Sequence, residues 1–112
     1  MSDLVRIPYP DMIQEFSRVL RKYLSEEEKI ALCAKLFADA SRDGVASHGL
    51  NRFPLFIDYI HQGFIKPENE PELVQHLGNI MIWDGQYGIG PLNAWHCMQA
   101  TVDKAKEHAW AM

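Results

Sequence analysis

The sequence lacks any apolar run that approaches the roughly 20 residues of a membrane-spanning helix. Its first residues, Met1-Ser-Asp-Leu-Val-Arg-Ile7, also lack the charged start, apolar stretch and cleavage site of a secretory signal peptide. These absences predict no membrane partner and make the cytosol the expected location. With 112 residues, the sequence has room for one domain with its own core and for no second domain.

Positive charge is scarce and scattered along the sequence. The 11 lysine and arginine residues are outnumbered by 15 aspartate and glutamate residues, which gives a formal net charge of −4. Domains that bind nucleic acid usually carry a basic stripe or patch that attracts the phosphate backbone. The sequence therefore predicts no nucleic-acid partner.

Cysteine is nearly absent, and the histidines are not spaced as metal ligands. Cys33 and Cys97 lie far apart, each inside an apolar helical pattern, which favours two buried free thiols over a disulfide or a metal site. No pair of histidines has the spacing HxxxH or HExxH. We therefore expect no metal site and interpret four of the histidines as surface or interface residues: His61, His76, His96 and His108.

Helical periodicity dominates the sequence. Apolar residues recur at spacings of three and four, prolines suit the first turns, and glycines follow the expected ends. Pro54 requires the third helix to begin near Arg52 or to kink. The last helix has an apolar face that includes Trp95, Met98 and Val102. These patterns predict four helices, at about 10–23, 26–43, 52–62 and 91–108.

Two short apolar segments lie between the third and fourth helices. They span about 72–77 and 80–84 and are separated by Gly78-Asn79, a pair that is compatible with a hairpin turn. Because a free two-stranded hairpin is marginally stable in water, we expect these strands to join a larger sheet or to cover a helix. The predicted fold class is α+β, mainly helical, in one domain over 1–112.

The residues that carry most chemistry are concentrated in one short stretch between Gly44 and Pro54. A hydroxyl, an imidazole, an amide and a guanidinium occur within six consecutive positions: Ser47, His48, Asn51 and Arg52. If the segment from His48 is helical or turn-like, His48 and Arg52 stand at i and i+4, and both side chains can face one side. A proton donor beside a fixed cation suits a substrate with a carbonyl next to a carboxylate.

A purely structural interpretation of this stretch is also open. Gly44 would end one helix, and Ser47 or Asn51 would cap the next. In that case, His48 and Arg52 only coat a first helical turn.

The segment Gly88-Ile-Gly90 invites comparison with a dinucleotide-binding turn, since it lies between a predicted strand and a predicted helix. The fingerprint requires a third glycine where this sequence has Asn93, and no acidic residue closing a second strand follows. We therefore favour turn glycines over a cofactor site.

Several motifs together resemble the type-2 malate/L-lactate dehydrogenase family. The longest is Asp43-Gly-Val-Ala-Ser-His-Gly-Leu-Asn-Arg-Phe-Pro-Leu-Phe56. The others are Gly63-Phe-Ile-Lys-Pro67, Trp83-Asp-Gly-Gln86, Gly88-Ile-Gly90 and Lys104-Ala-Lys-Glu-His108. The resemblance covers roughly residues 10–109, and its most specific part is the core of Ser47, His48 and Arg52.

The resemblance implies the N-terminal portion of a larger, non-Rossmann reductase fold that reduces small 2-oxoacids with NAD(P)H. It implies His48 as the proton donor, Arg52 as the anchor of the substrate carboxylate, and Ser47 and Asn51 as substrate-binding or orienting residues. It also implies a homodimer. Members of the family are much longer, so we expect the cofactor-binding domain to be absent from this chain. The alternative from another class is a non-catalytic helical module that binds a partner protein.

Overall fold

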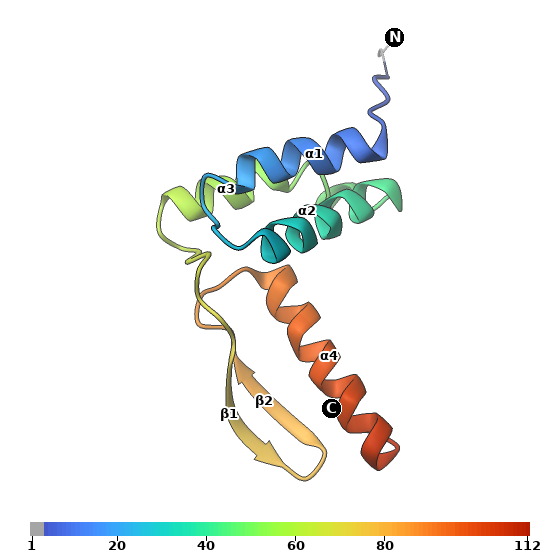
Figure 1. The fold of residues 1–112 in the computed structure, drawn as a ribbon, viewed down its shortest axis with the longest axis vertical. Helices are drawn as coiled ribbons and strands as arrows, with labels where there is room; N and C mark the ends of the chain where they lie inside the picture. Colours follow the sequence, from blue (N-terminus) through green and yellow to red (C-terminus); the bar gives the residue numbers. More distant parts are fainter. Residues whose placement is uncertain (1–3) are drawn as a thin grey trace. The chain divides into compact units, whose positions relative to one another are not determined.

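A computed structural model describes residues 4–112 and divides the chain into two compact units, Met1–Tyr59 and Ile60–Met112. The sequence predicts one domain over 1–112. In the structure, most residues that lie close together belong to the same one of these two units. The prediction about a signal peptide concerns the first seven residues. Three of these, Met1, Ser2 and Asp3, lie outside the described residues. The elements, in order along the chain, are α1 (Tyr9–Leu20), α2 (Glu27–Arg42), η1 (Ala46–His48), α3 (Phe53–His61), β1 (Glu72–Leu77), β2 (Ile80–Asp84) and α4 (Gly90–His108) (Figure 1).

Four phenylalanine rings pack against one another within the core of the first unit. The rings of Phe16 in α1 and Phe53 in α3 have centroids 4.3 Å apart. Phe37 of α2 meets Phe53 edge to face at 5.2 Å and stacks on Phe56 at 5.0 Å. Such pairs stabilise by about 0.5–1.5 kcal/mol beyond the burial of their area. The cluster therefore fixes the start of α3 against both α1 and α2.

A polar network joins the start of α1 to the last turns of α2. The Tyr9 hydroxyl donates to the Asp39 carboxylate, which also accepts from Lys35 and lies 3.4 Å from Arg42. The Arg42 guanidinium lies 4.5 Å from the centre of the Tyr9 ring, a cation–π distance. Hydrogen bonds from Lys35 and Tyr9 lower the pKa of Asp39.

The first helix is shorter than the sequence predicts. It ends at Leu20 instead of Tyr23, because the next residues tighten into a turn with bonds from Lys22 N–H to Val19 C=O (3.1 Å) and from Tyr23 N–H to Leu20 C=O (2.9 Å). The other helices lie within one residue of their predicted bounds, and α3 begins at Phe53 with Pro54 in its first turn.

The second unit contains an antiparallel hairpin and a long helix. β1 and β2 occupy the predicted ranges, and Leu77 lies opposite Ile80 across a two-residue turn. Gly78 has a φ of 58°, which suits the first central position of a type II′ turn. The Trp83 ring of β2 meets the His96 ring of α4 edge to face at 5.1 Å. These elements confirm the α+β, mainly helical class.

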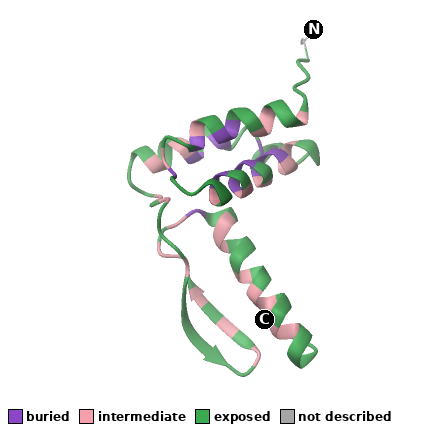
Figure 2. Cartoon of the chain, in the orientation of Figure 1, coloured by how far each residue is buried: buried purple, intermediate pink, exposed green. Residues whose placement is uncertain are grey.

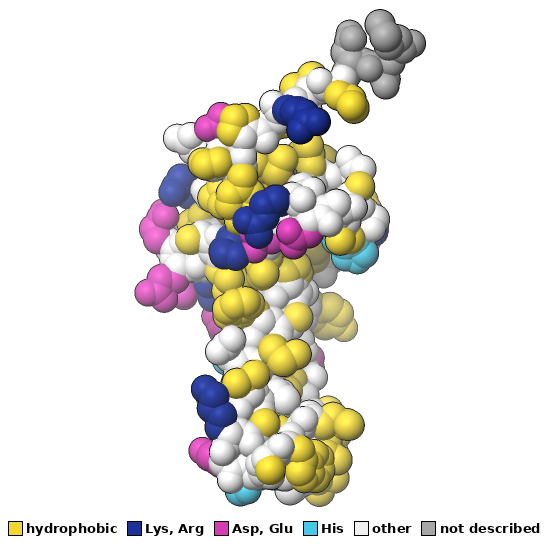
Figure 3. Space-filling model, turned by 90° about the vertical axis from the view of Figure 1, so that its right-hand side faces the viewer, with side chains coloured by type: hydrophobic (Ala, Val, Ile, Leu, Met, Phe, Trp, Pro, Cys, Tyr) yellow, Lys and Arg dark blue, Asp and Glu magenta, His cyan; other side chains and the backbone are white. Residues whose placement is uncertain are grey.

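The hairpin and α4 bury no residue fully, as Figure 2 shows. In α4, Trp95, Met98 and Val102 are 45%, 59% and 38% exposed. These three residues, which we call the α4 stripe, occupy one face of the helix at spacings of three and four. The opposite face includes half-buried Asn93 and Cys97. Hydrophobic side chains accordingly lie at the surface of this unit, in the lower part of Figure 3.

The α4 stripe makes self-association the expected behaviour of the chain at tens of micromolar. An exposed apolar face of this kind is usually covered by protein, and a second copy is available in any concentrated sample. Sedimentation velocity should show dimers or larger species. Trp95→Ser should shift the distribution toward monomer, whereas Glu107→Ser, a change of an exposed residue on another side of the same helix, should not. A strictly monomeric parent chain that binds no hydrophobic dye would contradict this expectation.

Candidate functional site

The candidate site lies in the first unit, on the segment that leads from α2 to α3. Gly44 has a φ of +85°, in the left-handed region that ends α2, and the single 3-10 turn of η1 follows at Ala46–His48. The turn is closed by a bond from His48 N–H to Val45 C=O of 3.0 Å. The four predicted site residues are all exposed: Ser47, His48, Asn51 and Arg52.

Ser47 joins the imidazole to the guanidinium. Its hydroxyl oxygen lies 2.8 Å from Nδ1 of His48, and its carbonyl accepts a hydrogen bond of 3.2 Å from Nε of Arg52. Ser47 thus contacts His48 through its side chain and Arg52 through its backbone. Three of the predicted residues form one hydrogen-bonded group.

The segment that carries this group is a turn and not a helix, one of the two conformations that the sequence analysis left open. His48 and Arg52 do not stand at i and i+4 of one helix. Gly49, between η1 and α3, has φ −104° and ψ −129°, which is not a helical conformation. Arg52 N–H bonds to Gly49 C=O at 3.0 Å and leads into α3. The pairing of His48 and Arg52 therefore depends on Ser47 and not on helical spacing.

Ser41, near the end of α2, holds this segment in place. Its hydroxyl accepts a hydrogen bond of 2.7 Å from the Leu50 N–H. Gly49 is buried against it: a Cβ at position 49 would lie 2.0 Å from the Ser41 Oγ and 2.7 Å from the Ser41 nitrogen. Only glycine fits at this distance. Sequence reasoning missed Ser41, and the one local signal was the unexplained glycine after His48.

Asn51 has a different position from the rest of the group. It lines a small cavity of about 130 Å³ together with Ser41, Gly44, Ala46 and Leu50. This cavity lies beside the segment that carries Ser47 and His48. No hydrogen bond described for residues 4–112 joins Asn51 to the imidazole, so the structure gives it no orienting contact with His48.

The Gly88-Ile-Gly90 segment is built as a turn, as the sequence analysis favours. A Cβ at Gly88 would lie 2.7 Å from the Asn69 carbonyl, so this glycine serves an internal contact. Asn93, which occupies the third position of the dinucleotide fingerprint, donates a 2.9 Å hydrogen bond to Gly85 C=O. Gly88 and Asn93 therefore both make contacts within the chain, which agrees with turn glycines in this segment.

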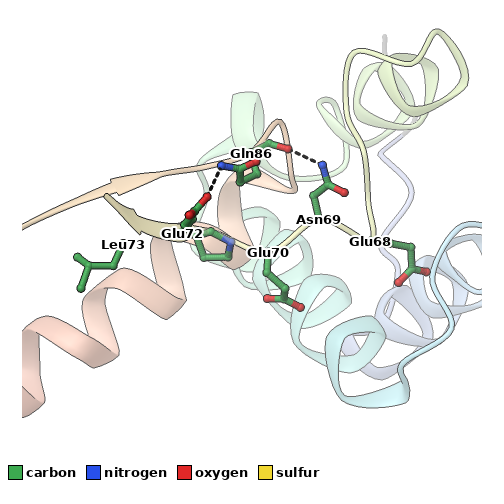
Figure 4. A pocket seen from close by; sticks show the side chains of 7 residues that line it. Glu68, Asn69, Glu70, Glu72, Leu73 and Gln86 are labelled. Carbon is green, nitrogen blue, oxygen red and sulfur yellow. Dashed lines mark hydrogen bonds between the residues drawn. The ribbon is translucent and has the colours of Figure 1, made fainter. Parts of the chain in front are cut away.

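The same turn holds two non-glycine residues, Gln86 and Tyr87, at left-handed φ values of 56° and 59°. Side chains stabilise it: Asn69 donates to Gln86 C=O at 2.7 Å, and Gln86 Nε2 donates to Glu72 at 3.0 Å (Figure 4). Asn69, Glu72 and Gln86 line a depression of about 610 Å³ together with Glu68 and Glu70.

The thiols and possible metal ligands add no second site. Both cysteines are free: Cys33 is buried, and burial raises its pKa to about 12, so its thiol stays protonated. Cys97 is half-buried, less than the sequence predicts. Among residues 4–112, no three histidine, cysteine, aspartate or glutamate side chains are placed to hold a metal ion. None of the described helices is long and apolar enough to cross a membrane.

Comparison with known proteins identifies the family of the chain. The family model described as malate/L-lactate dehydrogenase matches residues 7–112, and the chain belongs to this family. Among curated relatives, the 2,3-diketo-L-gulonate reductase of Haemophilus influenzae is 39% identical over 104 residues, and that of Mannheimia succiniciproducens is 38% identical. Each alignment covers 93% of this chain and 31% of the relative.

Solved structures show the same fold. A malate dehydrogenase from Pyrococcus horikoshii superimposes with a TM-score of 0.85 at 26% identity, over 92% of this chain and 30% of its own. A sulfolactate dehydrogenase from Methanocaldococcus jannaschii gives 0.82 at 30% identity, over 88% and 28%. The chain therefore has the fold of the N-terminal portion of a larger dehydrogenase, and it spans less than a third of the relatives it matches.

Replacing Gly49 by alanine should disturb the candidate site through its contact with Ser41. Because the added Cβ meets backbone atoms at less than 3.0 Å, α2 and the site segment must move apart, at a cost of about 1–3 kcal/mol. Thermal unfolding followed by circular dichroism should show a lower midpoint. Gly90→Ala is the matched control, since a Cβ there meets nothing within 4 Å. Equal midpoints for the two variants would show that the Ser41 contact does not constrain the site.

Proposed function

We propose that this chain is the N-terminal part of an oxidoreductase that reduces a 2-oxoacid, similar to 2,3-diketo-L-gulonate, with NAD(P)H. One observation carries the proposal: Ser47 joins His48 and Arg52 in one exposed group. The names of the 38–39% identical relatives support the substrate class.

His48 would supply the proton in this reaction. Reduction of a keto group places negative charge on its oxygen, and the oxygen must receive a proton. Histidine is a common proton donor in enzymes, because an imidazole can both give up and take up a proton under mild conditions. The imidazole is exposed on η1, where a substrate can reach it.

Ser47 would determine which nitrogen of His48 acts. Its hydroxyl contacts Nδ1 at 2.8 Å and so occupies that nitrogen. Nε2 is then the nitrogen that can face a substrate and give up the proton.

Arg52 would bind the carboxylate of the substrate. A guanidinium carries five N–H groups in a planar fork that matches a carboxylate, and only one of them, on Nε, is used for Ser47 C=O. Asn51 would bind substrate hydroxyls from the neighbouring cavity. The reaction needs both an acid and an anchor, and the group provides the two on one short segment.

The cofactor would be bound by parts of the fold outside this chain. When bound, a nicotinamide supplies the hydride. The turn at Gly88 is packed internally and offers no site for it. We further propose a cytoplasmic homodimer, with the α4 stripe as the available apolar surface.

The exposed α4 stripe also favours a second candidate function. In this alternative, the chain is a non-catalytic module that binds a partner protein through that surface. Such a module would leave His48 and Arg52 without a chemical role.

The chain alone should not bind NADH measurably. The reason is that Gly88 packs on Asn69 and that Asn93 replaces the third glycine of the fingerprint. Isothermal titration calorimetry with NADH is the direct measurement, with the full-length Haemophilus influenzae reductase as the positive control. Micromolar affinity for the 112-residue chain would reverse this conclusion and revive the Gly88 site.

The roles of His48 and Arg52 can be separated in a chimera in which this chain replaces the matching part of the Haemophilus influenzae reductase. His48→Ala removes the general acid, and kcat should fall by about a hundredfold to ten-thousandfold with NADH affinity nearly unchanged. Arg52→Lys keeps the charge and loses the fork, so KM for the oxoacid should rise before kcat falls.

The control for this experiment is His61→Ala, which removes an exposed histidine from the end of α3. It should leave both constants at the parent values. A His48→Ala chimera that turns over 2,3-diketogulonate at the parent rate would refute the catalytic assignment. In that case, the module function would be favoured.

A further inference from the structure

The small cavity beside the candidate site contains polar groups that the chain itself does not use. Its volume is about 130 Å³, and its walls are formed by Ser41, Gly44, Ala46, Leu50 and Asn51. The Ser41 hydroxyl accepts a hydrogen bond of 2.7 Å from the Leu50 N–H, but it donates its own proton to no residue within 4–112. The side-chain amide of Asn51 makes no hydrogen bond with the described residues either. A hydroxyl donor and an amide are therefore available to a molecule that enters this cavity.

The cavity adjoins both residues that the proposed reaction needs. Ala46 is the first residue of η1, whose last residue is His48, and Asn51 directly precedes Arg52. In a 2-oxoacid, the carboxylate and the keto carbon are neighbours, and the rest of the molecule extends from the other side of the keto carbon. We call this remainder the substrate tail. When Arg52 holds the carboxylate and His48 serves the keto oxygen, the cavity is the neighbouring space for the tail.

The volume and the walls of the cavity restrict which tails fit. A water molecule takes up about 30 Å³ in the liquid, so the cavity has room for a few carbon and oxygen atoms and for no large ring. Ala46 and Leu50 offer apolar surface to carbon atoms. Ser41 and Asn51 offer hydrogen bonds to hydroxyl groups, and an apolar tail would displace water from them without replacing its hydrogen bonds. The cavity therefore suits a short hydroxylated chain.

We propose that this cavity selects the substrate by its tail, accepting a short hydroxylated tail and disfavouring an apolar tail of the same length. Ser41 and Asn51 determine the specificity through their unused hydrogen-bonding groups. Ala46 keeps the space open, because a larger side chain at this position enters the cavity that it lines. The inference rests on the proposed reduction of a 2-oxoacid and adds which 2-oxoacids are accepted. It gives Ser41 a second role beside its bond to Leu50.

The test compares two substrates in the chimera with the Haemophilus influenzae reductase. One is 2,3-diketogulonate, and the other is 2-oxohexanoate, which has the same number of carbons and no hydroxyl group. Asn51→Leu replaces the amide by an apolar group of similar size. The variant should lower the ratio of kcat/KM for diketogulonate to that for 2-oxohexanoate at least tenfold, mainly through a higher KM for diketogulonate.

The role of Ser41 is tested by a pair of variants. Ser41→Ala should lower the same ratio, and Ser41→Thr, which retains the hydroxyl, should preserve it. Gln14→Leu is the matched control, since it replaces an exposed amide in α1 that does not line the cavity. It should leave the constants for both substrates at the parent values.

Ala46→Leu tests the size of the cavity separately from its polarity. Filling the space should raise KM for diketogulonate at least tenfold. The kinetic constants for pyruvate, whose tail is a single methyl group, should stay within about twofold of the parent values. If circular dichroism shows that Asn51→Leu does not fold, Ala46→Leu and the Ser41 pair still decide the question.

The outcomes separate this inference from the proposed function. A folded chimera that reduces no 2-oxoacid, although the parent reductase does, would remove both. An active chimera in which Asn51→Leu leaves the ratio unchanged and Ala46→Leu leaves KM unchanged would overturn the inference alone. Equal losses on both substrates would also overturn it, because they would show that the cavity residues support the site without selecting the tail.

Discussion

The phenylalanine cluster of the first unit is the constraint on which the candidate site depends. Phe53 contacts both Phe16 and Phe37, and it directly follows Arg52 in the sequence. Burial of this ring therefore sets where α3 begins and where the backbone before it must run. With α2 fixed through Phe37 in the same cluster, the segment between the two helices has little freedom. The site lies on that segment.

A second constraint acts at the other end of the site segment. Gly49 approaches Ser41 too closely for any side chain, and the Leu50 N–H is bound by the Ser41 hydroxyl. Between these fixed points, Ser47 can bond His48 through its hydroxyl and Arg52 through its carbonyl. Preorganised polar groups on a rigid support suit the proposed proton transfer, since donors placed before a reaction need not reorganise during it. The support here is α2 and the start of α3.

The second unit has a different balance of forces. Its hairpin and helix are held by local turns and by the contact between Trp83 and His96, with almost no buried apolar surface of their own. Side-chain hydrogen bonds hold Gln86 and Tyr87 in the left-handed region, which costs on the order of 1–3 kcal/mol for each residue. A unit with so little core gains most from further layers. Two solved structures of this family are about three times as long as the part that matches this chain, which agrees with that need.

The sequence by itself determined the elements and the chemistry of the site. Apolar spacing, prolines and glycines located the four α-helices and both strands of the described residues, though not the short helix η1, because these signals act between residues a few positions apart. It also identified His48 and Arg52 through their residue types. Only the tertiary structure decided that Ser47 joins them and that Ser41 supports Gly49. Each of these depends on how the backbone bends at a glycine or on residues distant in sequence that meet only when helices pack, and no local pattern encodes such contacts.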